Sequence, residues 1–99
     1  MGIMWFAAAT HQQAYQAKHD LDLIRDTYEI EDINFIKPGI GETTRVLLRR
    51  IPHRVIVSDM EDEKLKHIIL MAREKNIQID VLPLKSYKCC GIIKNLKDT

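Results

Sequence analysis

Apolar and polar residues alternate in blocks along this chain, and each block predicts a strand or a helix. Residues 3–9 (IMWFAAA) are continuously apolar, which is typical of a strand covered on both faces. Thr10 follows as a candidate N-cap. Over residues 14–28, apolar residues recur three and four positions apart, the spacing of a helix with one buried face. The first third therefore predicts a strand followed by a helix.

The middle of the chain predicts a second strand and a second helix. The strand covers residues 33–36 and ends before Pro38, and the helix covers residues 42–50. Val46 and Leu47 lie on the apolar face of this helix, so we expect them in the core. Three arginines occupy its polar face: Arg45, Arg49 and Arg50.

The last third predicts two more strands and two more helices. A buried strand is expected over residues 54–58, and residues 58–61 resemble a capping box for a helix that runs through 65–76. Residues 77–81 alternate apolar and polar side chains, as in a strand with one solvent-facing side. Gly91 is expected to break a final short helix.

The predicted order of elements is β-α-β-α-β-α-β-α. Strands that alternate with single helices are usually joined by right-handed crossovers into a parallel sheet between two helix layers. We therefore predict an α/β fold, a three-layer α/β/α sandwich with a mainly parallel four-stranded sheet. No linker, internal repeat or low-complexity segment interrupts the chain, so residues 1–99 are expected to form a single domain.

Composition adds few constraints. The chain is 45% hydrophobic and 29% charged, as in ordinary globular domains. No apolar run approaches the roughly 20 residues that a membrane-spanning helix needs, so we expect no membrane association. Cys89 and Cys90 are adjacent, which disfavours a disulfide between them, and without a second pair they do not predict a zinc site. We interpret them as small buried thiols in a cytoplasmic protein.

Charge is distributed unevenly along the chain. The chain has 15 basic and 14 acidic residues. Residues 1–35 hold two basic and six acidic residues, which leaves 13 basic and eight acidic residues for residues 36–99. A polyanion would therefore bind the second part, although two ordinary solvated faces would also explain the pattern. The acidic first helix and the basic remainder could also make a head-to-tail contact, as in a homodimer.

Three predicted turns could bind a small ligand. In α/β sheets, ligands bind beyond the carboxyl ends of strands, where helix N-termini present free N–H groups. A Rossmann-like module that binds a nucleotide or a phosphate would use His11, Gly39, Gly41, Thr43, Ser58 and Asp59. The central turn is not a P-loop, because the Gly-Lys-Ser/Thr ending is absent, and an isolated Gly-x-Gly is more often a plain turn.

The sequence contains no recognisable catalytic motif. The four histidines do not share the spacing of a metal site. Asp59 is explained by a capping role, and burial explains the two cysteines more simply than reactivity does. We therefore predict no catalytic residue, no metal site and no cofactor, and we favour a protein that is not an enzyme.

Three segments of the second part share their order and spacing with a known family. They are the turn IKPGIGETTR (residues 36–45), the strand VIVSD (residues 55–59) and the lysine-rich segment KSYKCCG (residues 85–91). Over residues 33–93 the chain resembles the kink-turn RNA-binding ribosomal protein family. A protein of that family is expected to bind structured RNA.

The chain departs from that family at several points. Gly41 stands where the family has the asparagine that reads a guanine, and Tyr87 replaces a glycine. The chain stops at Thr99, before the family's closing strand, so the predicted strand at residues 3–9 could take that place in the sheet.

The resemblance implies that a helix N-terminus and a basic rim contact RNA. Glu42 would accept a hydrogen bond from a base edge, and the basic residues would neutralise phosphates, which gives salt-dependent affinity. The implied RNA-binding residues are Lys37, Gly39, Gly41, Glu42, Thr43, Thr44, Arg45, Arg49, Lys85 and Lys88. A non-catalytic protein-interaction or regulatory domain is a third hypothesis, and the exposed edge at residues 77–81 could also pair with another copy of the chain.

Overall fold

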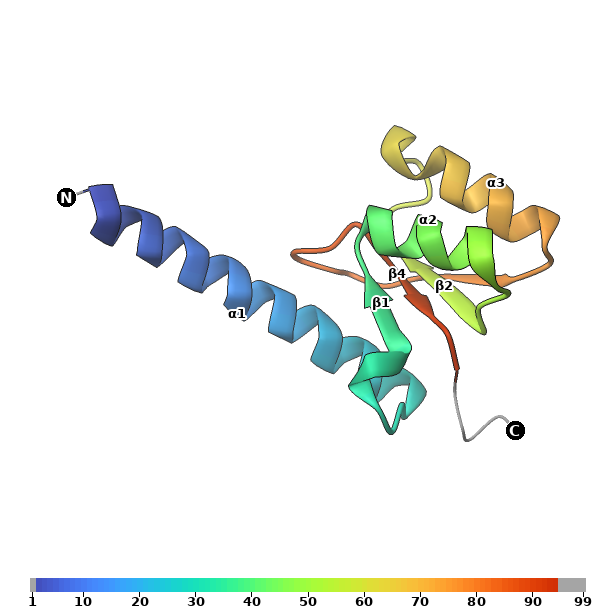
Figure 1. Ribbon diagram of the computed structural model, residues 1–99, viewed down its shortest axis with the longest axis horizontal. Coiled ribbons are helices and arrows are strands. Elements are labelled where there is room, and N and C mark those ends of the chain that lie inside the picture. Colours follow the sequence, from blue (N-terminus) through green and yellow to red (C-terminus); the bar gives the residue numbers. More distant parts are fainter. Residues whose placement is uncertain (1, 95–99) are drawn as a thin grey trace.

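The computed structural model describes the backbone of residues 2–94 and the side chains of residues 14–94. Within the described residues, three α-helices and four strands follow one another along the chain (Figure 1). They are α1 (Gly2–Tyr28), β1 (Ile36–Pro38), α2 (Ile40–Arg49), β2 (Arg54–Val57), α3 (Lys66–Glu74), β3 (Gln78–Val81) and β4 (Cys89–Ile92). Two short 3-10 helices precede β1 and α3, at Ile33–Phe35 and Glu63–Leu65.

The four strands form a mixed sheet in the order β1-β4-β2-β3. β4 runs antiparallel to both of its neighbours, and only β2 and β3 pair in parallel. The predicted mainly parallel sheet and regular β-α alternation are therefore wrong. The reason is β4: the predicted short helix around Gly91 is a strand, and it enters between β1 and β2 in the opposite direction. β4 also means that no strand from the N-terminus is needed to complete the sheet.

The strand predicted at residues 3–9 is also wrong. These residues belong to α1, which continues through Thr10 without a turn. A continuous apolar run does not by itself distinguish a strand from a helix, and the alanines at its end favour a helix. Whether Trp5 is buried lies outside the described side chains. Among the described residues, no helix combines the length and the apolar character needed to cross a membrane.

The helices cover both faces of the sheet. α2 and α3 pack on one face, against side chains that include Val55, Val57 and Cys89. The second half of α1 packs on the other face, where Ile24 meets a cluster that includes Ile56, Cys90 and Ile92 (Figure 1). Because successive strand residues point to opposite faces, the adjacent cysteines of β4 enter two different clusters.

The central elements agree with the sequence pattern. α2, β2 and β3 lie within two residues of the predicted helix and strands, and Val46 and Leu47 are buried as expected. The predicted strand at residues 33–36 begins later, because the Asp32 side chain accepts from the Asn34 N–H and holds a 3-10 turn. α3 likewise follows a 3-10 turn that Asp62 caps, rather than a capping box at residues 58–61.

Candidate nucleic-acid interface

α2 begins with an exposed N-terminus that no described side chain caps. Its N-cap residue, Gly39, has φ +93°, a conformation that L side chains rarely adopt, and its N–H donates to the Cys89 carbonyl at 2.8 Å. A Cβ added at Gly41 would meet nothing within 4 Å, so the first turn of the helix borders open space. N–H groups at such a helix end attract anions, because the helix dipole and the uncapped donors both favour negative charge.

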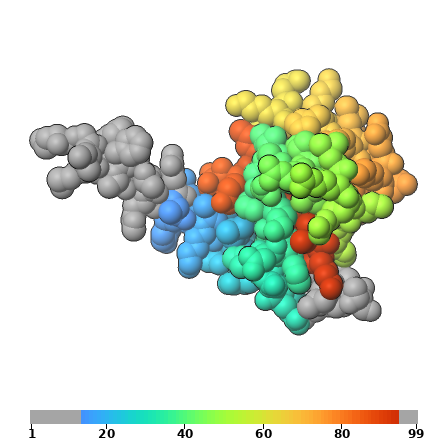
Figure 2. Space-filling view, viewed as in Figure 1, coloured from blue at the N-terminus to red at the C-terminus, as the bar shows by residue number. Residues whose placement is uncertain are grey.

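The loop before β4 lies beside this helix end. The Ser58 N–H donates to the Lys88 carbonyl at 2.8 Å, next to the bond between Gly39 and Cys89. The end of β2, the start of α2 and the loop are thereby brought together at one end of the sheet. In Figure 2 the orange loop lies between α1, in blue, and the start of α2, in green. Lys85 and Lys88 are both exposed in this loop.

A basic groove continues from this point along α2 and β1. The depression measures about 200 Å³ and is lined by Lys37, Glu42, Arg45, Val46, Arg49, Arg50 and Ile93. Four cations and a single carboxylate are thus among the described residues that line it. Glu42 pairs with Arg45 at 2.7 Å, which leaves the groove with an excess of positive charge.

Two threonines fix α2 in this position. Thr43 is fully buried; its hydroxyl donates to the Lys37 carbonyl at 3.4 Å and lies 3.6 Å from the Cys89 sulfur. The Thr44 hydroxyl donates to the Ile40 carbonyl at 2.7 Å and lies 3.1 Å from His67 Nε2 on α3. These contacts attach the helix to its neighbours, so that the N-terminus keeps its place relative to the loop.

Residues 15–95 match the profile of the PELOTA RNA binding domain. The chain belongs to the PELOTA RNA-binding domain family. This match confirms that the chain is an RNA-binding domain, the broader part of the expectation drawn from the sequence. The match does not support membership of the narrower kink-turn ribosomal protein family.

One longer relative shares most of this domain. The chain is 33% identical over 94 residues to "Cysteine protease StiP" of Acinetobacter baylyi, a match that covers 90% of this chain and 24% of the relative. The chain therefore spans about a quarter of that relative's length.

The surface of this PELOTA domain also carries a depression of mixed charge. It measures about 320 Å³ and lies between residues 60–63 and α3, and its charged lining residues are Glu61, Asp62, Glu63, Lys66 and Arg73. Asp62 pairs with Lys88 at 3.1 Å. The Lys64 N–H and the Lys88 ammonium hold the pKa of the Asp62 carboxyl below its usual range. Asp62 is thus ionised near neutral pH. Its carboxylate neutralises Lys88, which is one of the cations of the candidate interface.

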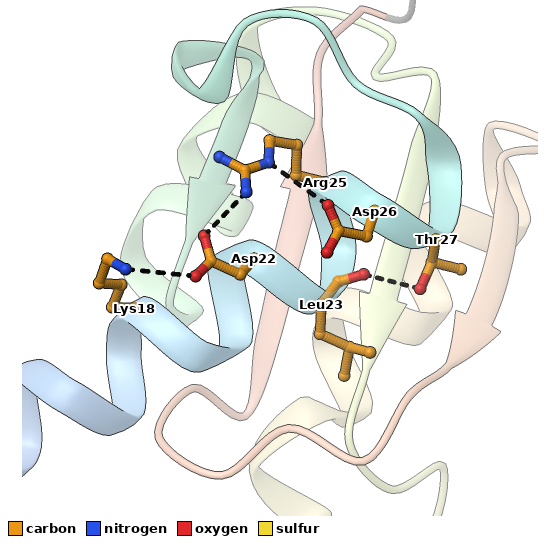
Figure 3. Close-up of polar contacts among 6 residues, drawn as sticks. All are labelled: Lys18, Asp22, Leu23, Arg25, Asp26 and Thr27. Carbon is orange, nitrogen blue, oxygen red and sulfur yellow. Dashed lines mark hydrogen bonds and ion pairs between the residues drawn. The ribbon is translucent and has the colours of Figure 1, made fainter.

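α1 carries its exposed charges in local pairs. Lys18 lies 3.5 Å and Arg25 3.3 Å from Asp22, and Arg25 also lies 3.6 Å from Asp26; Figure 3 draws these contacts as dashed lines. These contacts balance the charges along α1, in contrast to the groove beside α2, where cations outnumber the single carboxylate.

Of the residues of the small-ligand alternative, Gly39, Gly41 and Ser58 are brought together at one end of the sheet, while Thr43 is buried and bonded to the Lys37 carbonyl. The His11 side chain lies outside the described part of the chain, and its backbone is inside α1 rather than at a turn. Asp59 accepts from the Glu61 N–H at 2.9 Å, which is a turn contact. Among the described residues, no three His, Cys, Asp or Glu side chains are placed to hold a metal ion.

Sequence reasoning missed two kinds of residue at this site. Arg50 and Ile93 line the groove, and the outward position of Arg50 on the helix stripe could have indicated it. Asp20 contacts the loop before β4 from α1, with no local signal in the sequence, because its partners lie 65 to 67 positions further along the chain.

Proposed function

We propose that this PELOTA domain binds structured RNA of the kinked class, across the N-terminus of α2, the basic groove and the loop before β4. The observation that supports this most directly is the continuity of these three features. An uncapped helix N-terminus meets a groove with four cations, and two exposed lysines lie beside it. A phosphate backbone could contact all three at once.

Each feature would make a different contact with the RNA. The first-turn N–H groups of α2 would bind a phosphate where Gly41 leaves room for close approach. Lys37, Arg45 and Arg49 would follow the backbone along the groove, and Lys85 and Lys88 would contact a neighbouring strand. Most of the affinity would then be electrostatic and fall with salt.

Recognition would depend more on RNA shape than on base identity. Gly41 has no side chain with which to read a base edge. Glu42 could accept a hydrogen bond from a base, although it pairs with Arg45 in the free protein. Phosphate contacts position a protein without reporting sequence, so a rigid surface of this kind selects an RNA whose backbone already has the matching bend.

A mobility-shift titration tests this proposal. The probes are a kink-turn hairpin and a straight duplex of equal length and composition, each across a salt series. We expect preferential binding of the kinked probe, and a loss of about tenfold or more in affinity for Lys37→Glu combined with Arg45→Glu. Lys18→Glu combined with Arg25→Glu on α1 reverses the same number of charges; it is the matched control and should retain binding. Equal binding of both probes would refute shape selection, and equal loss in the control would refute the position of the surface.

The protease activity named for the longer relative is not part of this proposal. Cys89 and Cys90 are fully buried, and desolvation raises the pKa of both thiols, that of Cys90 to about 12. A nucleophilic cysteine needs an accessible thiol with a lowered pKa. The two thiols of this domain are instead inaccessible and have raised pKa values.

A further inference from the structure

Asp20 of α1 makes an unusual long-range contact. Its side chain is 0% exposed. Oδ1 accepts from the Lys85 N–H at 2.6 Å, and Oδ2 accepts from the Ser86 N–H at 2.6 Å and the Tyr87 N–H at 2.9 Å. A buried carboxylate is thus bound by three consecutive backbone donors of the loop before β4.

Consecutive N–H groups that converge on one point form an anion-binding nest. A buried carboxylate is costly unless it is hydrogen-bonded, and hydrogen bonds to an ionised acceptor are stronger than neutral ones. Here the loop supplies the hydrogen bonds that the buried carboxylate needs, and the carboxylate supplies the acceptor that the three N–H groups need. Because Asp20 occupies the nest, these three N–H groups are engaged within the protein, and the loop meets a ligand through its exposed side chains.

The rest of the loop is held at its two ends. The Leu82 N–H donates to the Val57 carbonyl at 3.1 Å, and the Lys88 carbonyl accepts from Ser58 at 2.8 Å. Leu82, Leu84 and Tyr87 pack against the cluster beneath α1. The contact with Asp20 is the polar anchor of the centre of the loop, between the two exposed lysines.

We propose that Asp20 is a positioning residue for RNA binding, which it supports from α1 by fixing the loop that presents Lys85 and Lys88. This inference rests on the function proposed above. It assigns a functional part to the helix that packs on the face of the sheet opposite α2.

An electrostatic effect and a positioning role predict opposite changes in RNA affinity for Asp20→Asn. Removal of a negative charge would by itself strengthen binding to a polyanion. Asparagine places an N–H₂ group against at least one backbone donor, so the positioning role predicts weaker binding instead. Asp20→Glu keeps the charge and moves the carboxylate by one methylene, so the positioning role predicts weaker binding where charge alone predicts no change.

The test measures the affinity of the kink-turn hairpin for wild type, Asp20→Asn and Asp20→Glu across a salt series. Asp26→Asn and Asp26→Glu are the matched controls, since Asp26 is an exposed carboxylate of the same helix (Figure 3). We expect about fivefold to tenfold weaker binding in both Asp20 variants, with a salt dependence reduced by about one phosphate contact. The controls should bind like wild type or slightly tighter.

Two further readouts separate positioning from a general loss of stability. Amide hydrogen exchange should accelerate at residues 85–87 in the Asp20 variants while β2 and β4 remain protected. Lys85→Ala should weaken binding in wild type but have little further effect in Asp20→Asn, because the lysine is already misplaced there.

The outcomes distinguish this inference from the proposed function. If wild type does not bind the hairpin, the proposed function fails, and the positioning role fails with it. If wild type binds and the Asp20 variants bind equally well or tighter, only the positioning role is overturned. Unchanged exchange at residues 85–87, exchange that rises equally in β2 and β4, or additive effects of Asp20→Asn and Lys85→Ala would also overturn it.

Discussion

At the scale of single residues, Cys89 and Cys90 show how far a local pattern can be interpreted. Their side-by-side position disfavoured a disulfide between them, and the interpretation as buried thiols is confirmed, since both are free and fully buried. The sequence could not show that they enter separate clusters, because that depends on β4 being a strand.

The two thiols should react slowly with alkylating reagents. Burial raises the pKa of each, so the reactive thiolate is scarce at neutral pH, and access is also blocked. We expect little modification of either cysteine by iodoacetamide at pH 7.5 in the folded protein, and complete modification of both in guanidinium chloride, measured by intact mass. Rapid modification of the folded protein would contradict the burial of these side chains.

Asp62 should weaken RNA binding by holding Lys88. Its carboxylate pairs with that lysine at 3.1 Å, and RNA binding would have to break or share this contact. Asp62→Asn keeps an oxygen that can cap the following 3-10 turn but releases the lysine. We expect binding to the kink-turn hairpin to tighten by about threefold at low salt, with less gain at high salt.

Glu61→Gln is the control for this effect. It removes the same charge from a neighbouring exposed position, so a general electrostatic effect would tighten binding equally in both variants. A larger gain in Asp62→Asn identifies release of Lys88 as the cause, and equal gains would contradict it.

At the scale of elements, the sequence predicted the elements around α2 and failed at both ends of the chain. α2 and β3 have clear periodicity, β2 contains a short apolar run, and these elements are bounded by Pro or by Asn76, whose φ is +58°. The alanine-containing run at residues 3–9 has no period that separates a strand from a helix. β4 contains Gly91, a residue that usually weakens strands, and it becomes a strand through pairing with β1 and β2 and burial of its neighbouring side chains.

The same limit applies to the candidate site. The turn at residues 39–45 and the lysines of the loop were found from local motifs and a resemblance. Arg50 and Ile93 also line the groove, and Asp20 holds the loop. These contributions depend on how separate elements pack, which a local motif does not show. Local sequence indicates candidate contact residues more readily than the residues that hold them in place.

A polar cluster joins the C-terminal end of α1 to the sheet. Asp80 of β3 accepts from the Tyr28 hydroxyl at 2.7 Å, from Arg54 at 2.5 Å and from the Gln78 side chain at 3.0 Å. The Arg54 guanidinium also lies 4.8 Å from the centre of the Tyr28 ring. Burial alone would raise the pKa of the Asp80 carboxyl, but the hydrogen bonds from Gln78, Tyr28 and Arg54 outweigh it and lower the pKa.

This cluster should make stability depend on acid pH. An aspartate has a pKa of about 3.9 in an unfolded chain, and a lower value in the folded state adds stability above that pH, which is lost as pH falls through the folded-state value. We expect Asp80→Asn to lower the free energy of unfolding by about 1–2 kcal/mol at pH 7, through the lost charge-assisted bonds. The difference should shrink towards pH 3.

Urea unfolding of both proteins between pH 3 and pH 7 measures this dependence. A difference that stays constant over the range would contradict the role of the ionised carboxylate. A difference that grows towards low pH would mean that the folded-state pKa is raised rather than lowered.

At the scale of the whole molecule, charge and shape divide the domain into two sides. α2 and β1 carry the basic groove, while α1 lies across the sheet with its charges paired. The excess of positive charge in the second part of the sequence is thus found at the groove, while Glu61, Asp62 and Glu63 line the depression beside α3. We expect RNA to approach the α2 side, with Asp20 linking the two sides through the loop before β4.

The most direct test of this account is a ¹⁵N NMR titration of the domain with the kink-turn hairpin. We expect the largest chemical-shift changes at residues 37–50 and 85–88, with little change at residues 14–19 of α1 or in α3. Such a result would place RNA on the groove, the N-terminus of α2 and the loop. Changes concentrated on α1 or α3, or no changes at low salt, would contradict the central claim.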